Sequence, residues 1–81
     1  MSNHQKLKDL LMDVFLIDES EYGLQLSQDD VETWDSMGLV AMAVGVEETF
    51  GYHLTQEEAL SIKKFQDVVD ILTTKGIPFD D

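Results

Sequence analysis

The stretch DSMGLVAMAVGVEETFG, residues 35–51, decides the fold of this 81-residue chain. From Ser36 onward it is almost wholly apolar until Glu47, and it ends at Gly51, a residue that readily adopts the positive φ of a helix C-terminus. These features predict a helix over residues 36–50. Because successive helical residues are turned by about 100°, one side should face the core, and that side carries Leu39, Met42, Ala43, Val46 and Phe50.

The opposite side of the same helix carries Met37, Ala41, Val44 and Glu48. A surface helix needs no apolar residues there, so Met37 and Val44 have two interpretations. They make a second buried contact, which periodicity alone favours, or they form an exposed strip on which a partner docks.

Amphipathic and capping patterns predict three more helices. Residues 4–16 repeat apolar positions at helical spacing, with Leu7, Leu10, Leu11, Val14 and Phe15 on one face. A capping box of Thr55 and Glu58 precedes a short helix over about residues 56–62. The last helix ends at Lys75 and Gly76 and has the apolar positions Phe65, Val68, Val69 and Leu72.

Residues 17–34 show no sustained period and predict a long, mostly irregular connection, held to the core by Leu24, Leu26 and Val31. No stretch shows the alternation of a strand. The predicted fold is therefore all-α: a small four-helix bundle of three main helices and one short third helix. The chain suffices for one domain, residues 1–81, in which residues 76–81 form a flexible tail.

The charge of the chain is strongly negative. There are 17 acidic residues against 5 lysines, and the segment between Lys8 and Lys63 holds thirteen Asp or Glu and no basic residue. This charge argues against nucleic acid as a partner and favours basic protein surfaces. The alternative is that the acidity only maintains solubility.

Cysteine and long apolar segments are both missing from the sequence. Without cysteine, disulfides and thiolate metal sites are excluded, and any thiol chemistry must come from outside the chain. There is no signal-peptide pattern and no stretch of about 20 apolar residues that could span a bilayer. We therefore expect a cytoplasmic protein that does not insert into membranes.

Ser36 stands where the predicted second helix begins. Serine before an apolar run is most often an N-cap, and the local residues alone favour that role. The backbone N–H groups of a helix start also point outward, and the helix dipole favours an anion there. A phosphate ester on Ser36 would therefore be stabilised, apart from repulsion by neighbouring carboxylates.

Two segments, DSMGLVAMAVGVEETFG (35–51) and HLTQEEALSIKKFQDVVDIL (53–72), resemble the acyl and peptidyl carrier proteins, small acidic domains that carry 4′-phosphopantetheine. The family pattern is Asp-Ser-Leu at the start of the second helix, then apolar positions and an acidic pair before Phe-Gly. The first helix and the long connection also fit in length, so the resemblance covers essentially the whole chain. It implies that Ser36, flanked by Asp35 and Met37, accepts 4′-phosphopantetheine from coenzyme A, and it leaves open that Ser36 caps the helix as well.

The same resemblance implies a non-catalytic carrier, and we expect it to be a monomer. Helices complete at both ends favour a free-standing protein, with excision from a larger synthase as the alternative. The thiol of the prosthetic group would carry acyl or aminoacyl thioesters in fatty-acid, polyketide or nonribosomal peptide biosynthesis. Its partners would be a phosphopantetheinyl transferase, a loading ligase or transferase, and condensing or acyl-transfer enzymes with basic docking surfaces. By the resemblance, the docking contacts are Met37, Val44, Glu47 and Glu48, which makes Met37 and Val44 exposed.

Two positions depart from the usual fatty-acid carriers. Many of those carriers have glutamate where this chain has Ala41, which weakens the acidic patch. Trp34 before the motif is more typical of carriers of specialised pathways, and a packing role explains it equally well. The sequence does not identify the cargo.

Other functions fit the residues less well. A Ser-His-Asp hydrolase would need a histidine beside Ser36, but His4 and His53 are predicted in the first helical turn and in the turn after residue 51. A calcium loop over residues 18–29 fails at Tyr22, which takes a ligand position, so no metal site is predicted. The alternative of another class is an acidic interaction protein without a prosthetic group, such as a nucleic-acid mimic or a partner-binding module.

Overall fold

The structure, a computed structural model, describes residues 2–32 and 34–79. Its four helices are α1 (Asn3–Phe15), α2 (Ser36–Phe50), α3 (Gln56–Ser61) and α4 (Phe65–Thr74). The described residues contain no strand, and only an isolated bridge pairs Ser27 with Lys64. The predicted all-α bundle with a short third helix is therefore confirmed, and each helix begins and ends within one residue of its predicted bounds.

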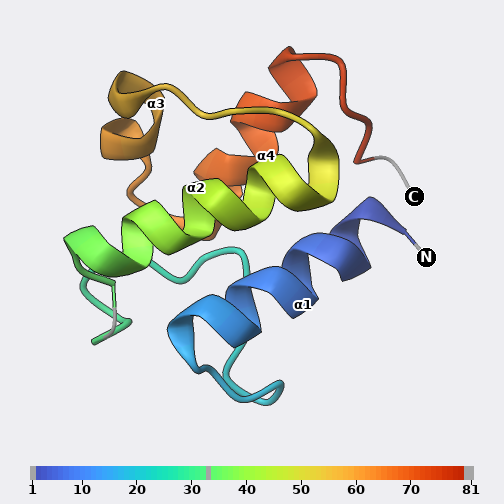
Figure 1. Ribbon diagram of the computed structural model, residues 1–81. Helices are drawn as coiled ribbons and strands as arrows, with labels where there is room; N and C mark the ends of the chain where they lie inside the picture. Colours follow the sequence, from blue (N-terminus) through green and yellow to red (C-terminus); the bar gives the residue numbers. More distant parts are fainter. Residues whose placement is uncertain (1, 33, 80–81) are drawn as a thin grey trace.

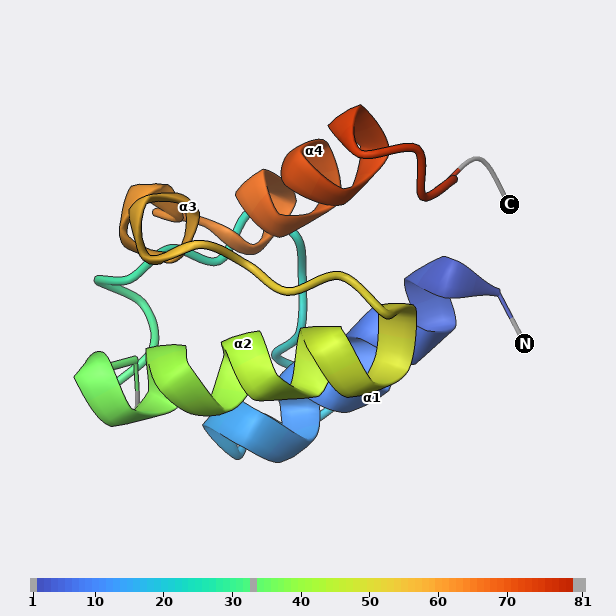
Figure 2. The same ribbon diagram turned by 45° about the horizontal axis from the view of Figure 1, so that its top comes forward.

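α1 packs against α2, α3 contacts α2, and α4 contributes to the same core. α1 and α2 lie side by side, and α3 and α4 lie on the other side of α2 (Figures 1 and 2). α3 lies over the half of α2 that begins at Ser36, whereas the first residues of α1 and the end of α4 lie at the opposite end of the molecule. Among the described residues, none of the helices has the length and the apolar character that a membrane span requires.

The ends of α2 and α3 follow from local capping. The Asp35 side chain accepts a hydrogen bond of 2.8 Å from the Gly38 N–H, and Gly51 ends α2 with a φ of 76°. At α3, the Thr55 hydroxyl accepts from the Glu58 N–H at 3.1 Å, and the Glu58 carboxylate accepts from the Thr55 N–H at 3.0 Å. The predicted capping box is thereby confirmed.

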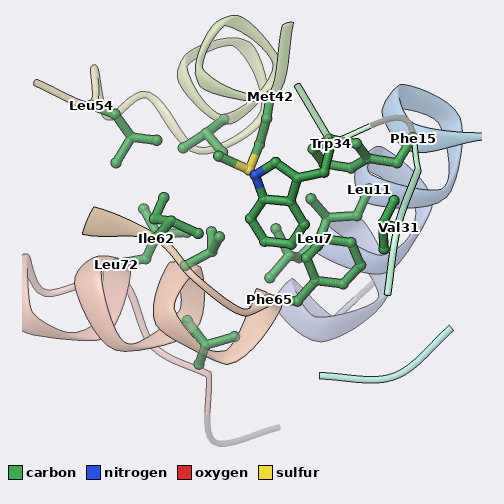
Figure 3. Close-up of a cluster of buried hydrophobic side chains, with 13 residues drawn as sticks. Leu7, Leu11, Phe15, Val31, Trp34, Met42, Leu54, Ile62, Phe65 and Leu72 are labelled. Atoms are coloured by element: carbon green, nitrogen blue, oxygen red, sulfur yellow. The ribbon is translucent and has the colours of Figure 1, made fainter. Parts of the chain in front are cut away.

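The core is a cluster of buried apolar side chains from all parts of the chain except α3 (Figure 3). At its centre, the ring of Phe65 lies 5.1 Å from that of Trp34 and 5.6 Å from that of Phe15, centroid to centroid. On the predicted core side of α2, Met42 and Val46 are fully buried. The remaining residues of that side pack against the cluster and are Leu39, Ala43 and Phe50. Its buried members are Leu7, Leu11, Phe15, Val31, Trp34, Met42, Val46, Leu54, Ile62, Phe65, Val68, Val69 and Leu72.

The connection between α1 and α2 is irregular, as predicted, and it is fixed to the rest of the fold. Val31 is buried, and Leu24 and Leu26 pack against the core. The carbonyl oxygens of Leu24 and Leu26 also accept hydrogen bonds from the first two backbone N–H groups of α4, at 3.0 and 3.1 Å. The long connection therefore supports the start of α4 while it leads the chain to Ser36.

Residues 77–79, part of the predicted flexible tail over residues 76–81, make contacts with α1 and α2. Asn3 donates its side-chain N–H to the Pro78 carbonyl at 2.7 Å, and Nε2 of His4 lies 2.8 Å from the Phe79 carbonyl oxygen. The Phe79 ring also packs against Phe50, with centroids 5.6 Å apart. Residues 77–79 are thus tied to α1 and α2 by contacts between residues far apart in the sequence. Residues 80 and 81 lie outside the described residues.

Candidate functional site

Ser36 is the first residue of α2, and its side chain is exposed. Its hydroxyl has no hydrogen-bond partner among the residues that the structure describes. The N-cap is Asp35, so the prediction that Ser36 caps the helix is wrong. Aspartate and serine are both good caps, and the extended backbone at residue 35 gives the role to Asp35. Ser36 is therefore left without a structural task.

The start of α2 suits an anion attached to Ser36. The N–H of Gly38 is taken by Asp35, while the N–H groups of Ser36 and Met37 belong to the turn that has no acceptor within the helix. These groups and the positive end of the helix dipole favour a negative charge on the Ser36 oxygen. A phosphodiester fits this position, because Ser36 is exposed.

An apolar groove of about 450 Å³ lies between α2 and α3 and begins at Ser36. Leu39 and Ala43 line it on the α2 side, and Leu54 and Ala59 line the other side. Glu47 and His53 stand at the end away from Ser36, where Nδ1 of His53 lies 2.5 Å from Oε2 of Glu47. The full lining is Ser36, Leu39, Val40, Ala43, Val44, Glu47, His53, Leu54, Thr55, Gln56, Ala59 and Leu60.

Large apolar side chains are exposed around this groove. Met37 is 80% exposed and Val44 is 51% exposed, so the buried interpretation that periodicity favoured is wrong. Val40 on α2 and Leu60 on α3 are also exposed and line the groove, and the sequence interpretation missed both. The exposure of Val40 could have been predicted, because Val40 stands one helical turn before Val44. The exposure of Leu60 could not, since the sequence of a short helix does not reveal which of its faces is covered.

The predicted docking residues lie on one exposed strip of α2. Glu48 is exposed, as are Met37 and Val44. Glu47 is exposed as well, but its carboxylate is held by His53. Ala41 is exposed between them, so an apolar methyl group stands where many fatty-acid carriers have a carboxylate. The strip therefore combines apolar side chains with two acidic ones.

At α3, hydrogen bonds change the acidity of two side chains. The Thr55 backbone N–H and the Tyr52 hydroxyl both donate to Glu58, and together they lower the pKa of Glu58, with the Thr55 bond the larger cause. The hydrogen bond between the Tyr52 hydroxyl and Glu58 raises the pKa of Tyr52. Glu58 therefore stays ionised at neutral pH and holds the start of α3, which forms one wall of the groove.

Both histidines of the chain lie in contacts with residues other than Ser36. His4 contacts Phe79 at the far end of the molecule, and Nδ1 of His53 contacts Glu47. Within residues 2–32 and 34–79, no group of three or more His, Cys, Asp or Glu side chains could hold a metal ion. The geometry thus presents an exposed hydroxyl beside an apolar groove.

Several curated proteins are similar to this chain over most of its length. It is 35% identical to an acyl carrier protein of Coprothermobacter proteolyticus, over 84% of this chain and 83% of that protein. It is 32% identical to one of Petrotoga mobilis, over 88% of this chain and 84% of that protein. An acyl carrier protein of Rubrobacter xylanophilus is 36% identical over 82% of each chain.

Neither a protein-family model nor a solved structure matches the chain. The relatives at 35% and 32% identity nevertheless extend over more than four fifths of both partners in each comparison. All of these relatives share one name, acyl carrier protein. The chain therefore belongs to the acyl carrier protein family.

Proposed function

We propose that Ser36 carries 4′-phosphopantetheine and that residues 1–81 act as a single, monomeric, non-catalytic carrier domain. The prosthetic group supplies a flexible arm with a terminal thiol, which holds acyl or aminoacyl groups as thioesters. The observation that carries this proposal is the exposed Ser36 hydroxyl at the first position of α2, where Asp35 already serves as the cap. The family of the chain supports it.

Attachment needs chemistry that the chain itself lacks. The Ser36 oxygen would bond to the β-phosphorus of coenzyme A as the diphosphate P–O bond breaks, and adenosine 3′,5′-bisphosphate would leave. A base of the phosphopantetheinyl transferase would take the Ser36 proton. This chain contributes the exposed oxygen, the unpaired N–H groups of the first turn and the helix dipole, all of which favour the new phosphodiester charge. It has no cysteine, so no thiol of its own competes for the cargo.

The exposed strip of α2 is the proposed docking surface. Met37, Val44, Glu47 and Glu48 would contact the transferase, the loading ligase or transferase, and the condensing or acyl-transfer enzymes. Basic groups on these enzymes would be attracted by the negative charge of the carrier. Val40 and Leu60 extend the strip with apolar area, so partners with an apolar patch beside their basic residues fit best.

An intact-mass measurement tests the attachment. The purified chain is incubated with coenzyme A and a broad-specificity phosphopantetheinyl transferase and is then weighed. We expect a gain of one phosphopantetheinyl group in the unmodified sequence and in Ser20→Ala, which removes another exposed serine. Ser36→Ala should keep its helical circular dichroism and gain nothing. No gain in the unmodified sequence would refute the proposal and favour an acidic interaction protein without a prosthetic group.

A further inference from the structure

Trp34 is buried two residues before Ser36. Its side chain is only 5% exposed. Its ring is stacked on Phe65, with centroids 5.1 Å apart and planes at 17°, and lies 5.3 Å from Phe15. Since aromatic rings from α1 and α4 hold the indole, it cannot turn toward solvent without loss of these contacts.

The indole N–H of Trp34 is a buried donor without an acceptor. Within the described part of the chain, Nε1 is the one buried side-chain nitrogen or oxygen that has no hydrogen-bond partner. Buried polar groups in folded proteins are almost always paired, because an unpaired one loses its hydration and gains nothing. Phenylalanine would provide a stacked ring at this position without that cost. An acceptor on a bound ligand would pair this donor and remove the cost.

The direction of the N–H indicates where that ligand enters. The nitrogen-bearing edge of the indole is turned toward Met42 and toward the side of the core where Leu54 lies (Figure 3). Leu54 belongs to the buried cluster and also lines the groove that begins at Ser36. Leu39 and Ala43 likewise line the groove and pack against the cluster. A layer of apolar side chains thus separates the groove from the donor.

We propose that Trp34 Nε1–H donates a hydrogen bond to an oxygen atom within the cargo chain, so that this carrier prefers oxo- or hydroxyacyl chains over fully saturated ones. The inference rests on the proposed attachment of the cargo arm at Ser36. A chain that passes Leu54 and reaches Met42 brings its atoms beside the indole edge. A saturated chain leaves the donor unpaired there, whereas a carbonyl or hydroxyl oxygen pairs with it in surroundings of low dielectric, where such a bond is strong.

Nuclear magnetic resonance on the loaded carrier tests the proposal. The transferase loads Ser36 from coenzyme A derivatives that carry octanoyl or 3-oxo-, 5-oxo- or 7-oxo-octanoyl groups in a hydrolysis-resistant amide linkage. Trp34 is the single tryptophan, so the chain gives one indole N–H resonance. With at least one oxo chain we expect a downfield shift of this proton and roughly 3- to 10-fold slower exchange with solvent than with octanoyl.

The matched variant is Trp34→Phe, which keeps an aromatic ring and removes the donor. In the unmodified sequence, the responsive oxo chain should give a higher Tm than octanoyl, and this difference should vanish in Trp34→Phe. If Trp34→Phe does not fold, the indole N–H resonance of the unmodified sequence still tests whether the hydrogen bond forms. An indole resonance that is unchanged, or that responds equally to octanoyl and to every oxo chain, would overturn the inference. Intact mass separates this failure from that of the proposed function, because a loaded but unresponsive carrier refutes only the hydrogen bond.

Discussion

At the scale of single residues, the start of α2 shows how far the sequence predicts the site. The sequence places the helix start at Ser36 correctly, because apolar periodicity and capping are local. It does not decide which of two adjacent residues caps the helix, since both types are common caps. The extended backbone at residue 35 makes Asp35 the N-cap, and Ser36 is therefore available for modification.

Substitutions at Asp35 and Ser36 should therefore differ in their effect on stability. Asp35→Ala removes the acceptor for the Gly38 N–H, and we expect it to lower the free energy of unfolding by about 1 kcal/mol. Ser36→Ala should change it by less than about 0.5 kcal/mol, because the serine is exposed and is not the cap. Urea denaturation of both variants measures the difference. Equal losses would mean that Ser36 shares the capping role.

Leu16 ends α1 in a conformation that leucine rarely adopts. Its φ is 56° and its ψ is 49°, and its side chain is 81% exposed, so burial does not compensate for the strain. Leu16→Gly should raise the free energy of unfolding by about 0.5–1 kcal/mol, because glycine adopts positive φ without the steric cost. Leu16→Ala, which keeps the Cβ atom, should give no such gain in urea denaturation. A less stable Leu16→Gly variant would show that the leucine makes stabilising contacts.

At the scale of the elements, α3 depends on its cap more than on burial. It has six residues and none of them is buried. The sequence predicts its capping box, because those residues are three positions apart, but it does not predict the groove that α3 makes with α2. A groove depends on how two helices pack, and the exposure of Leu60 and Val44 follows from that packing alone.

The lowered pKa of Glu58 makes the stability of α3 depend on pH. A carboxyl group whose pKa is lower in the folded state stabilises that state above its unfolded pKa, ordinarily 4.5, and this stabilisation is lost as the pH falls through the folded value. Glu58→Gln should therefore be less stable than the unmodified sequence at pH 7, with a smaller difference at pH 3. Urea denaturation at both pH values measures this, with Glu57→Gln as the control from the same turn. A difference that does not depend on pH would contradict the role of the ionised carboxylate.

At the scale of the whole molecule, negative charge dominates. The formal net charge is −12, and within the described residues the Lys and Glu side chains form two ion pairs, Lys8 with Glu19 and Lys75 with Glu58. The sequence predicts this imbalance directly. It does not predict that residues 77–79 pack against α1, because those contacts join residues about 75 positions apart.

Self-repulsion should make the carrier more stable in salt. Between about 10 mM and about 150 mM sodium chloride the screening length falls from roughly 30 Å to about 8 Å. We expect the Tm to rise by about 4–8 °C, equivalent to about 1 kcal/mol for a domain of this size. The triple variant Asp29→Asn, Glu32→Gln, Glu48→Gln removes three exposed charges and should show a smaller rise. A Tm that falls with salt would mean that attractive ion pairs outweigh the repulsion.

The contacts of Asn3 and His4 with Pro78 and Phe79 also govern how the carrier can be joined to other proteins. They hold both ends of the described chain together at the pole opposite Ser36 (Figure 1). The 15 residues of α2 span about 22 Å, so a linker fused at either end would leave the molecule about that far from Ser36. An enzyme fused to either terminus could thus be tethered on the side away from Ser36, without blocking the arm that we propose Ser36 carries.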